Sequence, residues 1–221
     1  MSETTTPKTR VLLVEDHPIF REGLAQLINR QSDLFVCAEA GTPKEAIAAA
    51  HAHAPEVAVL DLMLNGAGGT ELIKQMRALF PGVPLLVLSM HEESVYAERV
   101  LRAGASGYVM KQEASGTVVT AIRTVVAGEM HVSRKLTVSL MQKALAAPEP
   151  IAGDEAALLS DRELQIFELI GANVPTREIA TRLGVSGKTV ETHRENIKRK
   201  LDLTTGAELV TRAQAWVHGG G

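Results

Sequence analysis

The first half of this chain repeats one pattern five times, a short apolar run followed by a stretch with helical spacing. The apolar runs are continuous rather than alternating, as in VLLV at 11–14. Continuous apolar strands are typical of a parallel sheet that is covered by helices on both faces. We therefore predict a doubly wound five-stranded α/β fold. Its strands are expected at 11–14, 34–38, 57–60, 84–88 and 107–109, and its helices at 18–30, 43–53, 69–80, 93–103 and 115–127.

The second half has a different pattern, which is helical throughout. From residue 158 onward we predict helices at 161–172, 176–183, 187–201 and 207–217. The turn LGVS (183–186) between two short helices indicates a helix-turn-helix motif. Upstream, a helical pattern covers 136–145, and AAPEPIAGDEAA has the composition of a linker. The predicted organisation is an α/β domain at 1–130, a helix and linker at 131–157, and a four-helix domain at 158–221.

Composition excludes several classes of protein. The single cysteine, Cys37, rules out an intramolecular disulfide framework and a CxxC metal site. No apolar run approaches the roughly 18 residues that cross a bilayer. The polar start MSETTTPKTR is unlike a signal peptide. We expect a cytoplasmic protein with no membrane association.

Chemistry-bearing residues follow four of the five predicted strands. Glu15 and Asp16 end the first strand, Asp61 the third and Ser89 the fourth, and Lys111 follows the fifth. The carboxyl ends of parallel strands share one edge of the sheet, and ligands bind there. We therefore expect these side chains to converge.

Three carboxylates at one edge would repel one another without a cation. Oxygen donors with no histidine or cysteine nearby favour Mg²⁺ over Zn²⁺. The expected ligands are Glu15, Asp16, Asp61 and a backbone carbonyl just after Asp61, which we assign to Met63.

A carboxylate at this edge can also attack phosphorus and form an acyl phosphate. We expect Asp61 to do so, with Lys111 and the Ser89 hydroxyl binding the transferred oxygens. Structural alternatives exist for each residue taken alone. The acidic pair Glu15-Asp16 could cap a helix, Ser89 could simply end a strand, and Lys111 could be a solvated surface lysine. Their order on successive strands favours the chemical interpretation.

Residues 10 to about 128 resemble the receiver domain of two-component response regulators, which has a flavodoxin-like fold. LLVEDHP resembles its acidic pair, VLDLMLNGAGG its phosphoacceptor loop, VLSM its switch hydroxyl and GYVMK its aromatic-x-x-Lys motif. The resemblance implies phosphoryl transfer from a sensor histidine kinase to Asp61. It also implies that Ser89 moves toward the phosphoryl group while Tyr108, otherwise a core residue, turns inward.

Two positions depart from the family pattern. Leu64-Asn65 stands where the family commonly has Met-Pro, and we expect a more flexible loop and an altered phosphoryl lifetime. Gln112 stands where the family often has a proline in a cis bond, which leaves the local geometry open.

The second helix of the predicted helix-turn-helix, GKTVETHRENIKRK, has a basic outer face that fits the major groove of DNA. Lysine and arginine attract phosphates, threonine can contact a base edge or a phosphate, and glutamate can accept a hydrogen bond from cytosine N4. The alternative is a solvated helix in which Glu191–Arg194 and Glu195–Lys198 form i,i+3 ion pairs. The expected DNA-binding residues are Ser186, Lys188, Thr189, Glu191, Thr192, Arg194, Glu195 and Lys198.

Residues 158–217 resemble the LuxR/FixJ/NarL-type DNA-binding domain, and EIATRLGVSGKTVETHRENIKRKL matches it nearly throughout. The resemblance implies double-stranded DNA as partner and base contacts at Glu191, Thr192 and Glu195. It also implies a homodimer through the last helix when the protein is phosphorylated, and RNA polymerase as a further partner. At Asn173, where the family usually has glycine, we expect a left-handed backbone conformation.

Together these features predict a DNA-binding transcriptional response regulator, not an enzyme, that is switched by Mg²⁺-dependent phosphorylation of Asp61. Two alternatives stay open. The receiver could be a phosphorylation-independent interaction module within a transcription factor. Less favoured is a phosphohydrolase that uses Asp61, because Met63 stands where a second aspartate would be needed and no substrate-binding cap is inserted.

Overall fold

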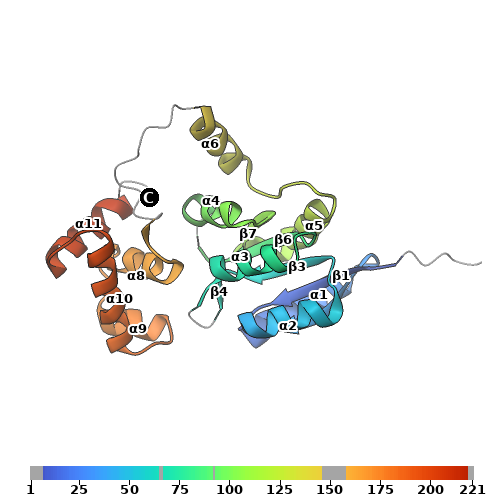
Figure 1. The fold of residues 1–221 in the computed structure, drawn as a ribbon, viewed down its shortest axis with the longest axis horizontal. Coiled ribbons are helices and arrows are strands. Elements are labelled where there is room, and N and C mark those ends of the chain that lie inside the picture. The colour runs from blue at the N-terminus through green and yellow to red at the C-terminus, as the bar shows by residue number, and fades with distance from the viewer. Residues whose placement is uncertain (1–6, 65–66, 92, 146–157, 219–221) are drawn as a thin grey trace, which may run out of the picture. The chain divides into compact units, whose positions relative to one another are not determined.

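The computed structural model describes residues 7–64, 67–91, 93–145 and 158–218, and the chain forms two compact units (Figure 1). The first unit contains the parallel sheet and the helices up to Leu145, and the second contains the helices from Asp161 onward. The predicted linker at 146–157 lies outside the described residues. Among the described helices, none combines the length with the hydropathy that a membrane span requires.

The first unit is built on five parallel strands in the order β2-β1-β3-β6-β7, so the predicted fold class is confirmed. The order reverses direction at β1, which places a topological switch point between β1 and β3. The strands are β1 (Thr9–Val14), β2 (Leu34–Ala40), β3 (Val57–Asp61), β6 (Leu85–Ser89) and β7 (Gly107–Met110). Two short strands, β4 (Met63–Leu64) and β5 (Ala67–Gly68), follow β3 outside this sheet.

Helices alternate with these strands as predicted (Figure 1). Proline occupies the first turn of two of them, and Thr42 caps the second by accepting a hydrogen bond from the Glu45 amide at 3.2 Å. The helices are α1 (Pro18–Asn29), α2 (Pro43–His53), α3 (Gly69–Leu79), α4 (Glu93–Ala103), α5 (Ala114–Val126) and α6 (Arg134–Leu145), with a 3₁₀ turn, η1 (Lys111–Glu113), after β7.

Alternate residues of each strand supply the two core layers, because successive strand side chains point to opposite faces. One layer joins Val11 and Leu13 of β1 to Ile28 of α1 and to Val118 and Ile122 of α5. All of these side chains are aliphatic, as the aromatic content of 3% requires. This packing leaves the carboxyl ends of the strands as the place where polar side chains gather.

The chain stays against the first unit after α5. The Tyr108 amide donates to the His131 carbonyl at 2.8 Å, and the Ser133 amide donates to Glu93 Oε1 at 2.8 Å. The backbone that follows α5 therefore pairs with β7, the edge strand that carries Tyr108.

The second unit consists of α8 (Asp161–Gly171), α9 (Thr176–Arg182), α10 (Gly187–Lys200) and α11 (Gly206–His218). Ser160 and Glu163 form a capping box at the start of α8. Asn173 has φ of 58°, so the expected left-handed conformation is confirmed, and its side chain accepts a hydrogen bond from Gln214 at 2.7 Å. The Asn173–Gln214 hydrogen bond thus joins the turn between α8 and α9 to α11, and α9 and α10 form the helix-turn-helix.

Candidate functional site

Two buried carboxylates meet at the switch point of the sheet. Glu15 directly follows β1, and Asp61 is the last residue of the neighbouring strand β3. Their exposed fractions are 1% for Glu15 and 4% for Asp61. Charged groups this deeply buried require a partner of opposite charge.

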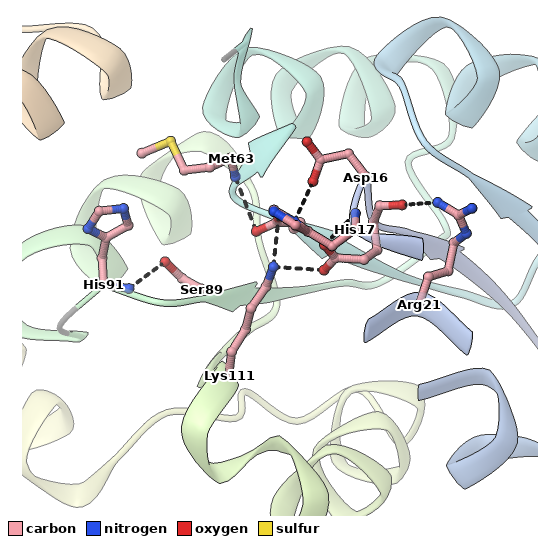
Figure 2. Close-up of polar contacts among 9 residues, drawn as sticks. Asp16, His17, Arg21, Met63, Ser89, His91 and Lys111 are labelled. Carbon is pink, nitrogen blue, oxygen red and sulfur yellow. Dashed lines mark hydrogen bonds and ion pairs between the residues drawn. The ribbon is translucent and has the colours of Figure 1, made fainter. Parts of the chain in front are cut away.

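Lys111 supplies that partner (Figure 2). Its Nζ lies 2.7 Å from Glu15 Oε2 and 2.9 Å from Asp61 Oδ2. The lysine reaches the carboxylates from η1, and its Nζ also lies 4.9 Å from the centroid of the Phe20 ring. Three residues that are far apart in the sequence are thereby brought into one ion-paired group.

The environment of Asp61 shifts its protonation. Burial raises the pKa of the Asp61 carboxyl to about 6, the Lys111 ammonium opposes this rise, and the Glu15 carboxylate adds to it. A carboxyl with this pKa is still ionised at neutral pH, so Asp61 can act as a nucleophile.

Asp16 and His17 complete the cluster. One ligand atom from each of Glu15, Asp16, His17 and Asp61 lies within 4.8 Å of all the others. His17 Nδ1 is 3.0 Å from Asp16 Oδ1 and 3.1 Å from Glu15 Oε1. The expectation of no nearby histidine is therefore wrong. Its position directly after the acidic pair, at the cap of α1, was the available signal.

Backbone amides hold the described residues at the two ends of the loop after Asp61. The Met63 amide donates to Asp61 Oδ1 at 3.2 Å, and the Gly69 amide donates to the Leu62 carbonyl at 2.7 Å. A Cβ at position 69 would lie 2.5 Å from the Leu62 carbonyl oxygen, so only glycine fits this close approach. Asn65, the family departure that follows the buried Leu64, lies outside the described residues.

Ser89 and Tyr108 both make contacts with the loop after β6. The fully buried Ser89 hydroxyl accepts from the His91 amide at 3.1 Å, and Figure 2 shows it directed toward His91. Tyr108 is buried, and its hydroxyl donates to the His91 carbonyl at 2.8 Å. The structure therefore places Tyr108 inward and joins both predicted switch residues to His91.

In the second unit, the predicted DNA-binding residues lie on α10 or at its cap. Ser186 is the N-cap and accepts from the Thr189 amide at 3.0 Å, and the two hydroxyl oxygens are 2.7 Å apart. The Thr192 hydroxyl donates to the Lys188 carbonyl at 3.0 Å. These small polar residues are thus tied to the backbone of the first turns of the helix.

The charged residues of α10 form the two i,i+3 pairs that the sequence suggested. Arg194 Nε lies 3.6 Å from Glu191 Oε2, and Lys198 Nζ lies 3.0 Å from Glu195 Oε1. Thr176, at the start of α9, also contacts Glu191, donating to its Oε1 at 3.1 Å. Sequence patterns had not pointed to Thr176, because it belongs to the neighbouring helix.

Both parts of the chain are similar to known proteins. Residues 11–123 match the response regulator receiver domain, and residues 157–213 match the bacterial regulatory proteins of the luxR family. The oxygen regulatory protein NreC of Staphylococcus haemolyticus is 36% identical over 208 residues, covering 92% of this chain and 96% of that protein.

Solved structures show the same architecture. A LuxR-family two-component response regulator from Aurantimonas sp. SI85-9A1 has 34% identity and a TM-score of 0.58, covering 63% of this chain and 99% of its own. The RcsB response regulator of Salmonella typhimurium is 22% identical with a TM-score of 0.56, covers 95% of this chain and 100% of its own, and shares the fold.

Proposed function

The chain belongs to the DNA-binding response regulators, in which a receiver domain is joined to a LuxR-type DNA-binding domain, and we propose that phosphorylation of Asp61 is the switch that controls it. Its class makes it a transcription regulator of a two-component system. The receiver implies a sensor kinase as partner, and the LuxR-type domain binds DNA. We place the receiver at residues 1–130, the helix and linker at 131–157, and the DNA-binding domain at 158–221.

The observation that carries this proposal is the ion-paired group of Asp61, Lys111 and Glu15. An ionised Asp61 oxygen attacks the phosphorus of a kinase phosphohistidine, the new P–O bond forms as the P–N bond breaks, and the imidazole leaves. The Lys111 ammonium, 2.9 Å from Asp61, then pairs with the oxygens of the transferred group. Ser89 releases the His91 amide and donates its hydroxyl to the same group, while Tyr108 stays inward.

Mg²⁺ is the ion proposed for the acidic cluster. Glu15, Asp16 and Asp61 offer carboxylate oxygens and Met63 would offer its backbone carbonyl, all hard donors that suit this ion. Bound there, Mg²⁺ would supply positive charge opposite the phosphoryl oxygens. His17 is left outside the ligand set, because Mg²⁺ prefers oxygen to imidazole nitrogen.

The output is proposed to be tighter binding of paired DNA half-sites by a homodimer. The predicted contacts to double-stranded DNA come from α10, with α11 as the dimer surface and RNA polymerase as a further partner. We assign the protein to the cytoplasm, where the proposed phosphoryl donor and DNA target would be met. In this proposal the phosphoryl group stays on Asp61 until it is lost, with no separate substrate, so we assign no enzymatic activity.

Asp61→Asn tests the switch. The full chain is incubated with a small-molecule phosphodonor and Mg²⁺, and the phosphorylated fraction is measured by intact mass. Wild type should be labelled and the variant should not. Equal labelling of the two proteins contradicts the assignment, and no labelling of either supports a phosphorylation-independent receiver.

DNA affinity of the labelled and unlabelled protein tests the output. Equal affinities would contradict the proposal that phosphorylation controls DNA binding, while the DNA-binding function itself would stand. Steady turnover of a generic phosphate ester would instead support the phosphohydrolase alternative.

A further inference from the structure

Three polar side chains form a closed ring between α9 and α10. The Thr176 hydroxyl donates to Glu191 Oε1 at 3.1 Å, and Arg194 donates to the Thr176 hydroxyl oxygen at 3.4 Å. Arg194 Nε lies 3.6 Å from Glu191 Oε2, which closes the ring. Each carboxylate oxygen of Glu191 therefore has its own partner, one from each helix.

The ring restrains a side chain that is otherwise free to rotate. The Glu191 side chain is 55% exposed, whereas that of Arg194 is 21% exposed and so more strongly held by its surroundings. An exposed glutamate on a helix surface normally samples several rotamers, and fixing it costs conformational entropy. Here the contacts within the protein fix it before any DNA arrives.

The second ion pair on α10 provides a contrast. Glu195 pairs with Lys198 at 3.0 Å, and its side chain is 68% exposed. Across the described ranges, no residue from another helix joins this pair. The two glutamates on the predicted DNA face thus differ in preorganisation, and only Glu191 is held from α9.

We propose that Thr176 is a positioning residue for base recognition by Glu191. Its hydroxyl, together with Arg194, holds the carboxylate in one orientation, in which the free lone pairs accept a hydrogen bond from the N4 amino group of a cytosine in the major groove. This inference rests on the proposed role of Glu191 in contacting bases. It adds the base group that is recognised, the cytosine N4 amino group. It also adds Thr176, a residue outside α10, as one that sets the degree of discrimination between bases.

The physical basis is the cost of binding. A preorganised group loses less rotamer freedom on contact with DNA, so more of the hydrogen-bond energy appears as discrimination between bases. Thr176 does not need to touch DNA for this effect. Removal of the Thr176 hydroxyl should lower discrimination at a single base pair of each half-site. Loss of a phosphate contact would instead weaken binding to all sequences alike.

The test is selection of bound sequences from a randomised duplex DNA library by the full chain, treated with a phosphodonor and Mg²⁺. The variants are Thr176→Val, which removes the hydroxyl at nearly constant shape, Thr176→Ser, which keeps it, and Glu191→Gln. Thr181→Val is the matched control, since the Thr181 hydroxyl donates to the Arg177 carbonyl within α9. Thermal unfolding confirms that each variant is folded.

We expect wild type and Thr176→Ser to prefer cytosine at one position of each half-site. Thr176→Val should reduce that preference on the order of five- to tenfold, with the other positions, the salt dependence of binding and the Thr181→Val profile unchanged. Glu191→Gln should shift the same position toward adenine, which glutamine recognises.

Three results would overturn the inference. An unchanged preference in Thr176→Val, together with a shifted preference in Glu191→Gln, removes the role of Thr176 and leaves Glu191 as a base contact. An unchanged profile in Glu191→Gln removes Glu191 from base recognition, and the role of Thr176 goes with it. A uniform loss of affinity in Thr176→Val would show that Thr176 only stabilises the contact between α9 and α10 and has no effect on base discrimination.

Discussion

Asp61, Glu15 and Asp16 carry three negative charges at this edge of the sheet, and the Lys111 ammonium pairs with the first two. When all four groups are ionised, two negative charges remain, which is the charge that one divalent cation neutralises. Burial raises the pKa of the Asp61 carboxyl to about 6, against the opposing Lys111 ammonium, and the Glu15 carboxylate adds to the rise. At the residue scale, the proposed reactivity of Asp61 and the proposed cation site around it therefore have one origin, the close approach of these carboxylates.

Asp61→Asn should stabilise the ion-free protein at high pH. Because the folded-state pKa of about 6 lies above the usual 3.8, the folded state binds more protons between these values, and stability falls as pH rises through 6. The amide removes this loss, so above pH 7 the variant should gain up to about 3 kcal/mol in free energy of unfolding. Urea unfolding at pH 5 and pH 8 in a chelator measures the effect.

Asp33→Asn serves as a control that should lower the stability at high pH instead of raising it. The reason is that the Arg123 guanidinium holds the pKa of the Asp33 carboxyl below its usual value. Adding Mg²⁺ should restore the free energy of unfolding that the wild-type protein loses at high pH. It should not change the free energy of unfolding of Asp61→Asn. Parallel pH profiles for wild type and Asp61→Asn would contradict this account.

The carboxyl ends of parallel strands share one edge of the sheet, and this rule explains which site residues could be predicted. It depends only on where apolar runs stop, so it brought Glu15, Asp61 and Lys111 to one edge. It does not specify how a side chain turns after the strand. His17 joins the cluster through the cap conformation of α1, and Ser89 turns toward the His91 amide. Both orientations come from local backbone geometry that residue spacing does not contain.

Elements were more predictable than their connections. Long apolar and helical periods placed every strand of the sheet within a few residues, because burial of those faces dominates the folding energy. The pairing of His131 with the edge of β7 was not predicted, since a single bridge has no periodic signal. Nor was the strand-like β4, which lies in a loop held by the close approach of Gly69 to Leu62.

Gly69→Ala should weaken the element that carries Asp61. The added Cβ would lie 2.5 Å from the Leu62 carbonyl oxygen, so the loop or α3 must shift, at about 1–3 kcal/mol of stability. The phosphorylation rate should fall as well, because Leu62 adjoins Asp61. Gly116→Ala in α5 is the matched control, having no atom within 4 Å of its added Cβ, and should gain about 0.5–1 kcal/mol. If both variants unfold alike in urea, the close approach is not what requires glycine.

The packing of α10 on α8 should be sensitive to acid through His193. Burial lowers the pKa of its imidazole, Glu163 raises it and Arg162 lowers it further. Its Nδ1 is buried without a hydrogen-bond partner in the part of the chain that the structure describes. Since the folded-state pKa lies below the usual 6.5, the unfolded state binds more protons, and stability is lost as pH falls through about 6.5.

The fluorescence of Trp216, the only tryptophan of the chain, reports unfolding of this unit. His193→Gln should flatten the loss of stability between pH 7 and pH 5, whereas the exposed His53→Gln on α2 should not. A decline that persists in His193→Gln would assign the acid sensitivity to other groups.

For the whole molecule, a switch at Asp61 and an output at α10 require linkage between two sites. If occupation of the phosphoryl site raises DNA affinity by some factor, DNA must raise the affinity of that site by the same factor. Couplings of this kind are typically about 5- to 150-fold. Reciprocity therefore gives a test of the mechanism that does not depend on how the two units are arranged.

Beryllium fluoride with Mg²⁺, a reversible mimic of a phosphoryl group on a carboxylate, makes the test measurable. We expect a saturating mimic to tighten binding to a selected DNA duplex, and saturating duplex to tighten binding of the mimic by an equal factor, both followed by titration of the full chain. Asp61→Asn should lose both effects and keep its basal DNA affinity. A factor seen in one direction only would mean that the mimic acts on DNA binding at a site other than Asp61, since binding equilibria at two linked sites cannot be coupled in one direction.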